Sequence, residues 1–257
     1  MTASILPLEL KDVNFEARGM RLIKDMNLAL TAGPRTAVIG PNGAGKSLLL
    51  RLCHGLLQPS SGKISWQAGP GGNAADHQAM VFQRPVMLRR SAAANIGYAL
   101  GLKGIRGAER RERIDAALAR AGLRRLADQP ARLMSFGEQQ RLALARAWAL
   151  RPQVLFLDEA TASLDPAATH AVEEMIHAIH AEGTRIVMTT HDLGQAKRLS
   201  DEVIFMHRGR MLERAPTAKF FDAPENDLAQ AFVKGELLWW NKRDLDDKPH
   251  HMPKYRR

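Results

Sequence analysis

The sequence is poor in the features that secreted, disulfide-linked or membrane-spanning chains require. Cys53 is the only cysteine among 257 residues, which excludes a disulfide framework and is typical of a reducing compartment. No uninterrupted apolar run approaches the roughly 18 residues that span a bilayer, and the first ten residues do not resemble a signal peptide. We therefore expect a cytoplasmic protein that reaches a membrane only through a partner.

Acidic residues are outnumbered, with 27 Asp and Glu against 37 Lys and Arg, which gives a net charge of +10. Such a surplus raises the possibility of a nucleic-acid partner. Much of it lies in residues 103–125 and in the tail 242–257, and neither region interleaves its charges with stacking aromatics. We favour a solvated helix face and tail, keep an anionic membrane surface as an alternative, and expect no nucleic-acid partner.

Strand-like and helix-like patterns alternate along the chain. Short apolar runs indicate strands at residues 36–40, 79–83, 154–158 and 185–190. The last two are separated by a helix with Asp165 at its N-cap, Pro166 in its first turn and Gly183 after its end. This alternation predicts an α/β fold with a parallel sheet covered on both faces. Residues 84–150 read as helical, which predicts an inserted helical subdomain at about 84–151.

The stretch GPNGAGKS, from Gly40 to Ser47, lies between a strand and a helix and fits the phosphate-binding loop pattern in full. Its glycines let backbone N–H groups converge on phosphate oxygens, Lys46 reaches the β- and γ-phosphates, and the Ser47 hydroxyl binds Mg²⁺. We predict that this segment binds the nucleotide through Gly40, Pro41, Asn42, Gly43, Ala44, Gly45, Lys46, Ser47 and Leu48.

Polar side chains follow three of the predicted strands. Asp158 ends the strand VLFLD and is expected to hold Mg²⁺, and Glu159 is the candidate base for the attacking water. His191 follows RIVMTT and could bond the γ-phosphate, although a lone histidine at a strand end is more often structural. Gln83 ends AMVFQ and could offer its amide oxygen to Mg²⁺ and its NH₂ to the water. The predicted catalytic residues are Glu159, His191 and Gln83, and the predicted metal ligands are Ser47, Gln83 and Asp158.

The stretch MSFGEQQR opens a helix with a polar run. Ser135 and Glu138 have the spacing of a capping box, which stabilises a helix start by about 1 kcal/mol. A helix N-terminus is also an anion site, and a capping hydroxyl can still donate to a phosphate. From this stretch alone, we favour the interpretation that Ser135 only caps the helix.

Together these motifs resemble the nucleotide-binding subunits of ABC transporters over almost the whole chain. GPNGAGKS corresponds to Walker A, Gln83 to the Q-loop, VLFLDE to Walker B, Ser163–Asp165 to the D-loop and His191 to the H-loop. MSFGEQQR corresponds to the LSGGQ signature. The resemblance implies a P-loop NTPase with a RecA-like core sheet, a small antiparallel β subdomain and an inserted helical subdomain, in an ATPase domain of residues 1–241.

The family works as a head-to-tail pair, with each ATP between the phosphate loop of one copy and the signature of the other. The resemblance therefore implies that Ser135, Gly137 and Glu138 bind the nucleotide of a second copy. It also implies ATP and Mg²⁺ as cofactors, a membrane permease as partner, and a solute-binding protein as an indirect partner. The expected location is the inner face of the cell membrane.

A finer resemblance concerns the cargo. MVFQRPVMLRRSAAANIGYAL, THDLGQAKRLSDEV and FVKGELLWW are similar to the ATPases of tungstate importers. Transport of another small solute is the alternative. A soluble ABC protein acting on nucleic acid or ribosomes and a degenerate subunit that binds ATP without turnover are further alternatives.

Some residues depart from the family pattern. Phe136 replaces the first glycine of the signature, Ala160 stands where proline is usual, and Leu48 where threonine is common. The aromatic residue that usually stacks on adenine corresponds to Ala17, with Phe15 two residues earlier. We further expect His170, His177 and His180 to form a solvated face rather than a metal site, and residues 237–240 (LLWW) to pack on the core.

Overall fold

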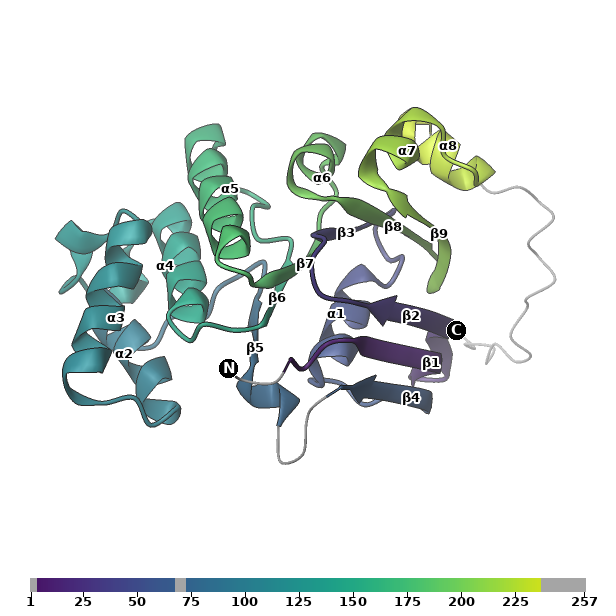
Figure 1. The fold of residues 1–257 in the computed structure, drawn as a ribbon. Helices are drawn as coiled ribbons and strands as arrows, with labels where there is room; N and C mark the ends of the chain where they lie inside the picture. The colour runs from purple at the N-terminus through teal and green to yellow at the C-terminus, as the bar shows by residue number, and fades with distance from the viewer. Residues whose placement is uncertain (1–3, 68–72, 237–257) are drawn as a thin grey trace, which may run out of the picture.

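The computed structural model describes residues 4–67 and 73–236 (Figure 1). The strands are β1 (Leu8–Ala17), β2 (Met20–Leu30), β3 (Thr36–Ile39), β4 (Ser61–Trp66), β5 (Gln78–Val81), β6 (Val154–Asp158), β7 (Arg185–Thr189), β8 (Glu202–His207) and β9 (Arg210–Pro216). The helices are α1 (Lys46–His54), α2 (Ala92–Leu102), α3 (Gly107–Arg120), α4 (Phe136–Trp148), α5 (Pro166–Ala181), α6 (Leu193–Leu199), α7 (Thr217–Asp222) and α8 (Asp227–Val233). Within the described residues, no helix is both long and apolar enough to cross a membrane. The segments 237–240 and 242–257 lie outside these residues.

The larger sheet has six strands in the order β5-β6-β7-β3-β8-β9. Five of them are parallel, as predicted, but β9 pairs antiparallel with β8, so the sheet is mixed. Thr189 lies opposite both Val38 and Asp158 in the strand register. The carboxyl ends of β3, β6 and β7 therefore meet at one edge of the sheet.

A second, antiparallel sheet has the order β2-β1-β4, and helix α1 lies between it and the larger sheet. Leu49, Leu50 and Cys53 of α1 belong to one buried cluster with side chains from both sheets, among them Leu8 and Phe156. The α/β architecture with a small antiparallel sheet is confirmed.

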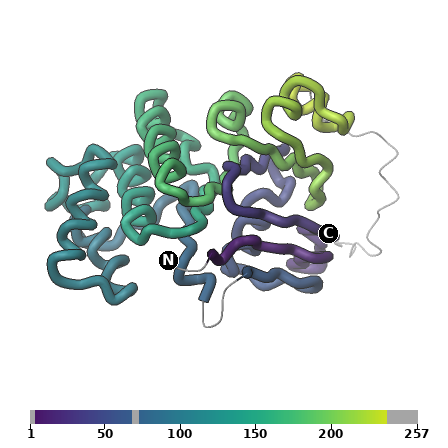
Figure 2. The backbone as a smooth tube through the Cα atoms, in the orientation of Figure 1, coloured from purple at the N-terminus to yellow at the C-terminus, as the bar shows by residue number. Residues whose placement is uncertain are grey.

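The opposite face of the six-stranded sheet is covered by other helices. Alternate residues of the strands point to the two faces: Phe156 joins the cluster around α1, whereas Leu155 and Leu157 join a cluster with helices α2 to α6. Figures 1 and 2 show α2, α3 and α4 gathered at one side of the molecule, next to α5. These three helices lie between β5 and β6 in sequence, so the predicted helical insertion is present.

The predicted helical segment 84–150, with breaks expected near Gly101, Gly104, Gly122 and Pro130, needs a correction at its start. Helix α2 begins only at Ala92, with Ser91 as its N-cap. Before it, the backbone pairs with a distant segment, since Arg90 O accepts from Ala131 N at 2.9 Å and Ser91 forms a bridge with Pro130. Tertiary pairing, rather than a helix, satisfies these backbone groups.

Helix α5 has the predicted cap, since Asp165 Oδ1 accepts from Ala168 N at 2.9 Å. The prediction that its histidines form a solvated face is wrong for two of them, which are half-buried. His177 Nδ1 lies 2.9 Å from the Arg35 guanidinium, and His180 Nδ1 lies 3.1 Å from Thr184 O.

Candidate functional site

The loop between β3 and α1 requires glycine at two positions. Gly40 has a φ of 145°, and a Cβ there would lie 2.1 Å from Met206 O. Gly45 has a φ of 99° and caps α1, and its Cβ would lie 2.8 Å from Ile23 Cδ1. Any larger side chain would displace the backbone. The resulting loop ends at the N-terminus of α1, where backbone N–H groups are free to bind an anion.

Lys46 places a buried cation inside this loop. Its Nζ donates to Gly40 O at 2.9 Å and to Pro41 O at 3.2 Å. Burial lowers the pKa of the Lys46 ammonium, while Glu159 and Asp158 act in the opposite direction. An anion that entered the loop would offer this ammonium a stronger partner than two neutral carbonyl groups.

Ser47 and Asp158 bring two oxygen groups together beside the loop. Ser47 Oγ donates to Asp158 Oδ1 at 2.6 Å, although the two residues are 111 positions apart. Asp158 is buried at the end of β6, and its Oδ2 lies 3.8 Å from the Arg51 guanidinium, one helical turn beyond Ser47. A hydroxyl and a carboxylate are ligands that Mg²⁺ prefers.

Glu159 and His191 form a second pair at the same edge. Glu159 has a φ of 48°, an unusual conformation for a residue with a Cβ. Its Oε2 lies 3.3 Å from His191 Nδ1, and the carboxylate is 17% exposed whereas the imidazole is 59% exposed. A carboxylate in this position is able to accept a proton from a bound water.

Gln83 makes no hydrogen bond to these residues in the described part of the chain. It is exposed and lies two residues beyond the end of β5. The structure thus joins Ser47 to Asp158 and Glu159 to His191, with Lys46 in the same loop, and shows no such bond from Gln83.

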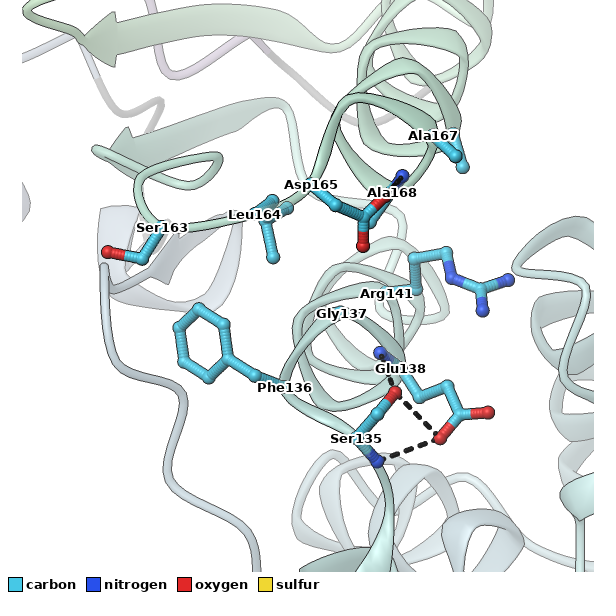
Figure 3. A pocket seen from close by; sticks show the side chains of 11 residues that line it. Ser135, Phe136, Gly137, Glu138, Arg141, Ser163, Leu164, Asp165, Ala167 and Ala168 are labelled. Carbon is cyan, nitrogen blue, oxygen red and sulfur yellow. Dashed lines mark hydrogen bonds between the residues drawn. The ribbon is translucent and has the colours of Figure 1, made fainter.

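Ser135, Gly137 and Glu138 lie at the start of α4, in a separate hollow of ≈ 520 Å³ (Figure 3). The predicted capping box is confirmed: Ser135 Oγ accepts from Glu138 N at 3.3 Å, and Glu138 Oε2 accepts from Ser135 N at 2.8 Å. The hollow is bounded on the other side by Ser163, Leu164, Asp165 and Ala168. No residue of the phosphate loop lines it.

The start of α4 packs closely against the start of α5. A Cβ on Gly137 would lie 3.0 Å from Ala168 Cβ. Phe136 is 38% exposed, and its ring points away from the capping box, toward Ser163 (Figure 3). The bulky residue therefore finds room without disturbing the cap.

The strand end expected to hold an aromatic residue carries Ala17, opposite Met20 at the turn into β2. Phe15 packs against the cluster that contains α1.

Arg51 and Thr189 also contact the site, and neither is among the residues that the sequence predicts. The polar pair of threonines ending the apolar run RIVMTT was the only available signal for Thr189.

Comparison with known proteins gives consistent matches. The family profile described as ABC transporter matches residues 23–162. The phosphate import ATP-binding protein PstB 2 of Natronomonas pharaonis is 33% identical over 238 residues, covering 86% of this chain and 84% of the relative. The methionine import ATP-binding protein MetN of Sodalis glossinidius is 32% identical over 250 residues, covering 93% and 73%. A dimeric ATP-binding cassette solved with ADP and Pi has a TM-score of 0.73 at 26% identity, covering 82% of this chain and 98% of that one.

Proposed function

The chain belongs to the ABC transporter family as an ATP-binding subunit that hydrolyses ATP, and from this premise we propose that it drives an importer as one half of a head-to-tail dimer. One observation carries the proposal. The phosphate loop and the start of α4 are separate sites in one chain, with no residue in common. Each site has groups that bind part of a nucleotide. The phosphate loop of one copy and the start of α4 of the other would therefore enclose one nucleotide together.

The first site binds ATP through the backbone from Gly40 to Leu48, with Lys46 on the phosphates. Ser47 and Asp158 fit Mg²⁺, because their oxygens are already within 2.6 Å of each other, and Gln83 joins them from the loop after β5. The ion, when bound, neutralises phosphate charge. Glu159 accepts the proton of the attacking water, and His191 holds the Glu159 carboxylate in place.

The second site belongs to the ATP of the other copy. Ser135, Gly137 and the first turn of α4 offer a hydroxyl group and free backbone N–H groups to the γ-phosphate, and Glu138 holds Ser135 through its backbone N–H. The dimeric cassette that resembles this chain is consistent with such pairing. Closure of the dimer around two ATP molecules and its reopening after hydrolysis would switch the permease.

The permease would dock on a groove of ≈ 250 Å³ beside Gln83. Phe82, Pro85 and Val86 line it on one side and Ala143 of α4 on the other, and Val86 is 68% exposed. This groove joins the loop after β5 to the helical insertion, so a partner seated there contacts both parts. The chain would then lie at the inner face of the membrane.

Tungstate, or a related oxyanion, is the cargo we propose, on the sequence phrases that resemble tungstate importers. The relatives named above import phosphate and methionine, and transport of another small solute is the competing proposal. Stimulation of ATP turnover in vesicles that contain the permease and its binding protein, compared between tungstate, phosphate and methionine, distinguishes them. A response to methionine alone would contradict the oxyanion proposal.

The dimer is tested with Glu159→Gln. We expect this variant to bind ATP, not hydrolyse it, and elute as a dimer in size-exclusion chromatography with ATP. Adding Ser135→Ala to the same chain should restore the monomer, because the second copy loses its contact with the phosphate. Full turnover by a strictly monomeric wild-type protein would overturn the proposal.

Permease docking is tested by reversing charge at Arg89 and Arg90, which are exposed and follow Val86 of the groove by three and four residues. We expect weaker co-purification with the permease and unchanged basal ATP turnover. Reversal at Lys197, exposed on α6, is the matched control. Equal loss of docking and basal turnover in the arginine variant would count against this docking site.

A further inference from the structure

Thr189 is the last residue of β7 and lies directly opposite Asp158 in the neighbouring strand. Its side chain is buried between the two acidic residues of the site. The Thr189 hydroxyl oxygen lies 3.0 Å from Asp158 Oδ1 and 3.0 Å from the backbone nitrogen of Glu159. One hydroxyl group therefore contacts both acidic residues of the proposed mechanism, Asp158 and Glu159.

The direction of these two hydrogen bonds is fixed by chemistry. The Glu159 amide is only a donor, so the Thr189 oxygen accepts from it. The Asp158 carboxylate, when ionised, is only an acceptor, so the Thr189 hydroxyl hydrogen is donated to it. Among the standard side chains of similar size, only threonine and serine satisfy both groups at once.

For Asp158, this bond fixes the orientation of a buried carboxylate. Oδ1 accepts from both Ser47 and Thr189, whereas the partner of Oδ2 among the described residues is the more distant Arg51. Ser47 belongs to the phosphate loop and is itself a predicted metal ligand. Thr189 is the donor that remains when Ser47 Oγ turns to an ion, and without it neither of these two hydrogen bonds would fix the orientation of the Asp158 carboxylate.

For Glu159, the same hydroxyl helps to hold an unfavourable backbone. The φ of 48° costs on the order of 1–3 kcal/mol for a residue other than glycine. The Glu159 N–H is shared between Thr189 Oγ1 at 3.0 Å and Thr189 O at 3.2 Å. This conformation aims the Glu159 carboxylate at His191.

We propose that Thr189 is a positioning residue that sets the Asp158 carboxylate for Mg²⁺ and the Glu159 carboxylate for water. The inference rests on the proposed function, since it assigns Thr189 a role through those two residues. Thr189 itself touches neither the nucleotide nor the ion.

The test uses Thr189→Val, which keeps the shape of the side chain and removes only its hydroxyl. Thr189→Ser restores the hydroxyl. Thr184→Val is the matched control, because Thr184 is a buried threonine just before the start of β7 whose hydroxyl donates to Pro152 O at 2.9 Å. Thermal unfolding of each variant verifies that it is folded.

The first measurement is ATP binding in the Glu159→Gln background, with Mg²⁺ and with EDTA. We expect Thr189→Val to reduce the gain in affinity from Mg²⁺ by roughly 10-fold to 100-fold, the value of one hydrogen bond to a charged group. Its affinity without Mg²⁺ should equal that of the parent. Thr189→Ser and Thr184→Val should retain most of the gain.

The second measurement is turnover with Glu159 intact. Thr189→Val should lower kcat by at least as large a factor even at saturating Mg²⁺, since the Glu159 backbone also loses a partner. If Thr189→Val is indistinguishable from wild type in both measurements, the inference about Thr189 is wrong, whereas the proposed function stands. A parent protein whose ATP affinity gains nothing from Mg²⁺ overturns the proposed function as well.

Discussion

The hydroxyl group of Ser135 donates to the carboxylate of Glu138, with 2.9 Å between Oγ and Oε2. A serine hydroxyl has one hydrogen to donate, so it cannot serve Glu138 and a phosphate together. In the isolated subunit the Ser135 hydroxyl hydrogen is therefore already bonded within the chain, to Glu138. Binding of a second copy's ATP requires the Ser135 hydroxyl to turn from Glu138 to the phosphate.

Replacement of Ser135 separates its two roles by magnitude. Ser135→Ala removes a cap and should lower the free energy of unfolding by about 1 kcal/mol. If the hydroxyl also binds the phosphate of a second copy, ATP turnover should fall by at least about 10-fold while the protein stays folded. Urea unfolding and steady-state ATPase assays measure the two effects. Turnover near the wild-type value would reduce Ser135 to a helix cap.

Phe136 should contribute to the dimer interface, because its exposed ring lies beside Ser163 at the edge of the second site. Removing the ring loses apolar area that a second copy would cover. In the Glu159→Gln background, Phe136→Ala should weaken ATP-dependent dimerisation by on the order of 1 kcal/mol, roughly fivefold. Analytical ultracentrifugation measures it. Leu102→Ala, an exposed leucine at the end of α2, is the control, and an effect of equal size there would argue against the interface.

Asp201 gives the unfolding free energy a defined pH dependence. The Arg35 side chain donates to both Asp201 oxygens and holds its pKa below the ordinary value of 3.8. A lowered pKa means that this pair stabilises the fold above pH 3.8 and that the contribution is lost as pH falls below it. Asp201→Asn should therefore be less stable than wild type at neutral pH and converge with it in acid. Urea titrations over a pH series test this, and a constant difference would contradict it.

Cys53 provides a probe of unfolding. Burial in α1 raises the pKa of its thiol to about 12. At about pH 8 the native thiol should resist iodoacetamide, whereas the unfolded chain should react readily. Because ATP binds only the folded protein, it should slow labelling further. Mass spectrometry of the single cysteine follows the reaction, and fast labelling of the native protein would contradict its burial.

Local patterns were enough to single out several residues that the structure brings together beside the phosphate loop. A glycine whose Cβ would lie 2.1 Å from a neighbouring carbonyl leaves no alternative at position 40, and apolar strands deliver Asp158 and Glu159 to one sheet edge. The capping box of Ser135 and Glu138 is likewise encoded within four residues.

Features that depend on distant segments were not predictable. The backbone at Ser91 is extended because Ser91 forms a bridge with Pro130, 39 positions later. Strands β8 and β9 are not among the strands that the sequence predicts, although the two-residue turn at Arg208 and Gly209, both with positive φ, is a hairpin signal. The contact of Thr189 with Asp158 and Glu159 depends on strand order, which no local pattern reveals.

Helix α1 is enclosed between two sheets, whereas α4 and α5 border a hollow of ≈ 520 Å³ from its two sides. A packed interior transmits strain, and an unfilled gap accommodates movement. Structural change on ATP binding should therefore concentrate in α2, α3 and α4, while the phosphate loop stays still. The subunit would bind the nucleotide beside α1, which stays still. The movement of α2, α3 and α4 would then change the surface that other chains contact.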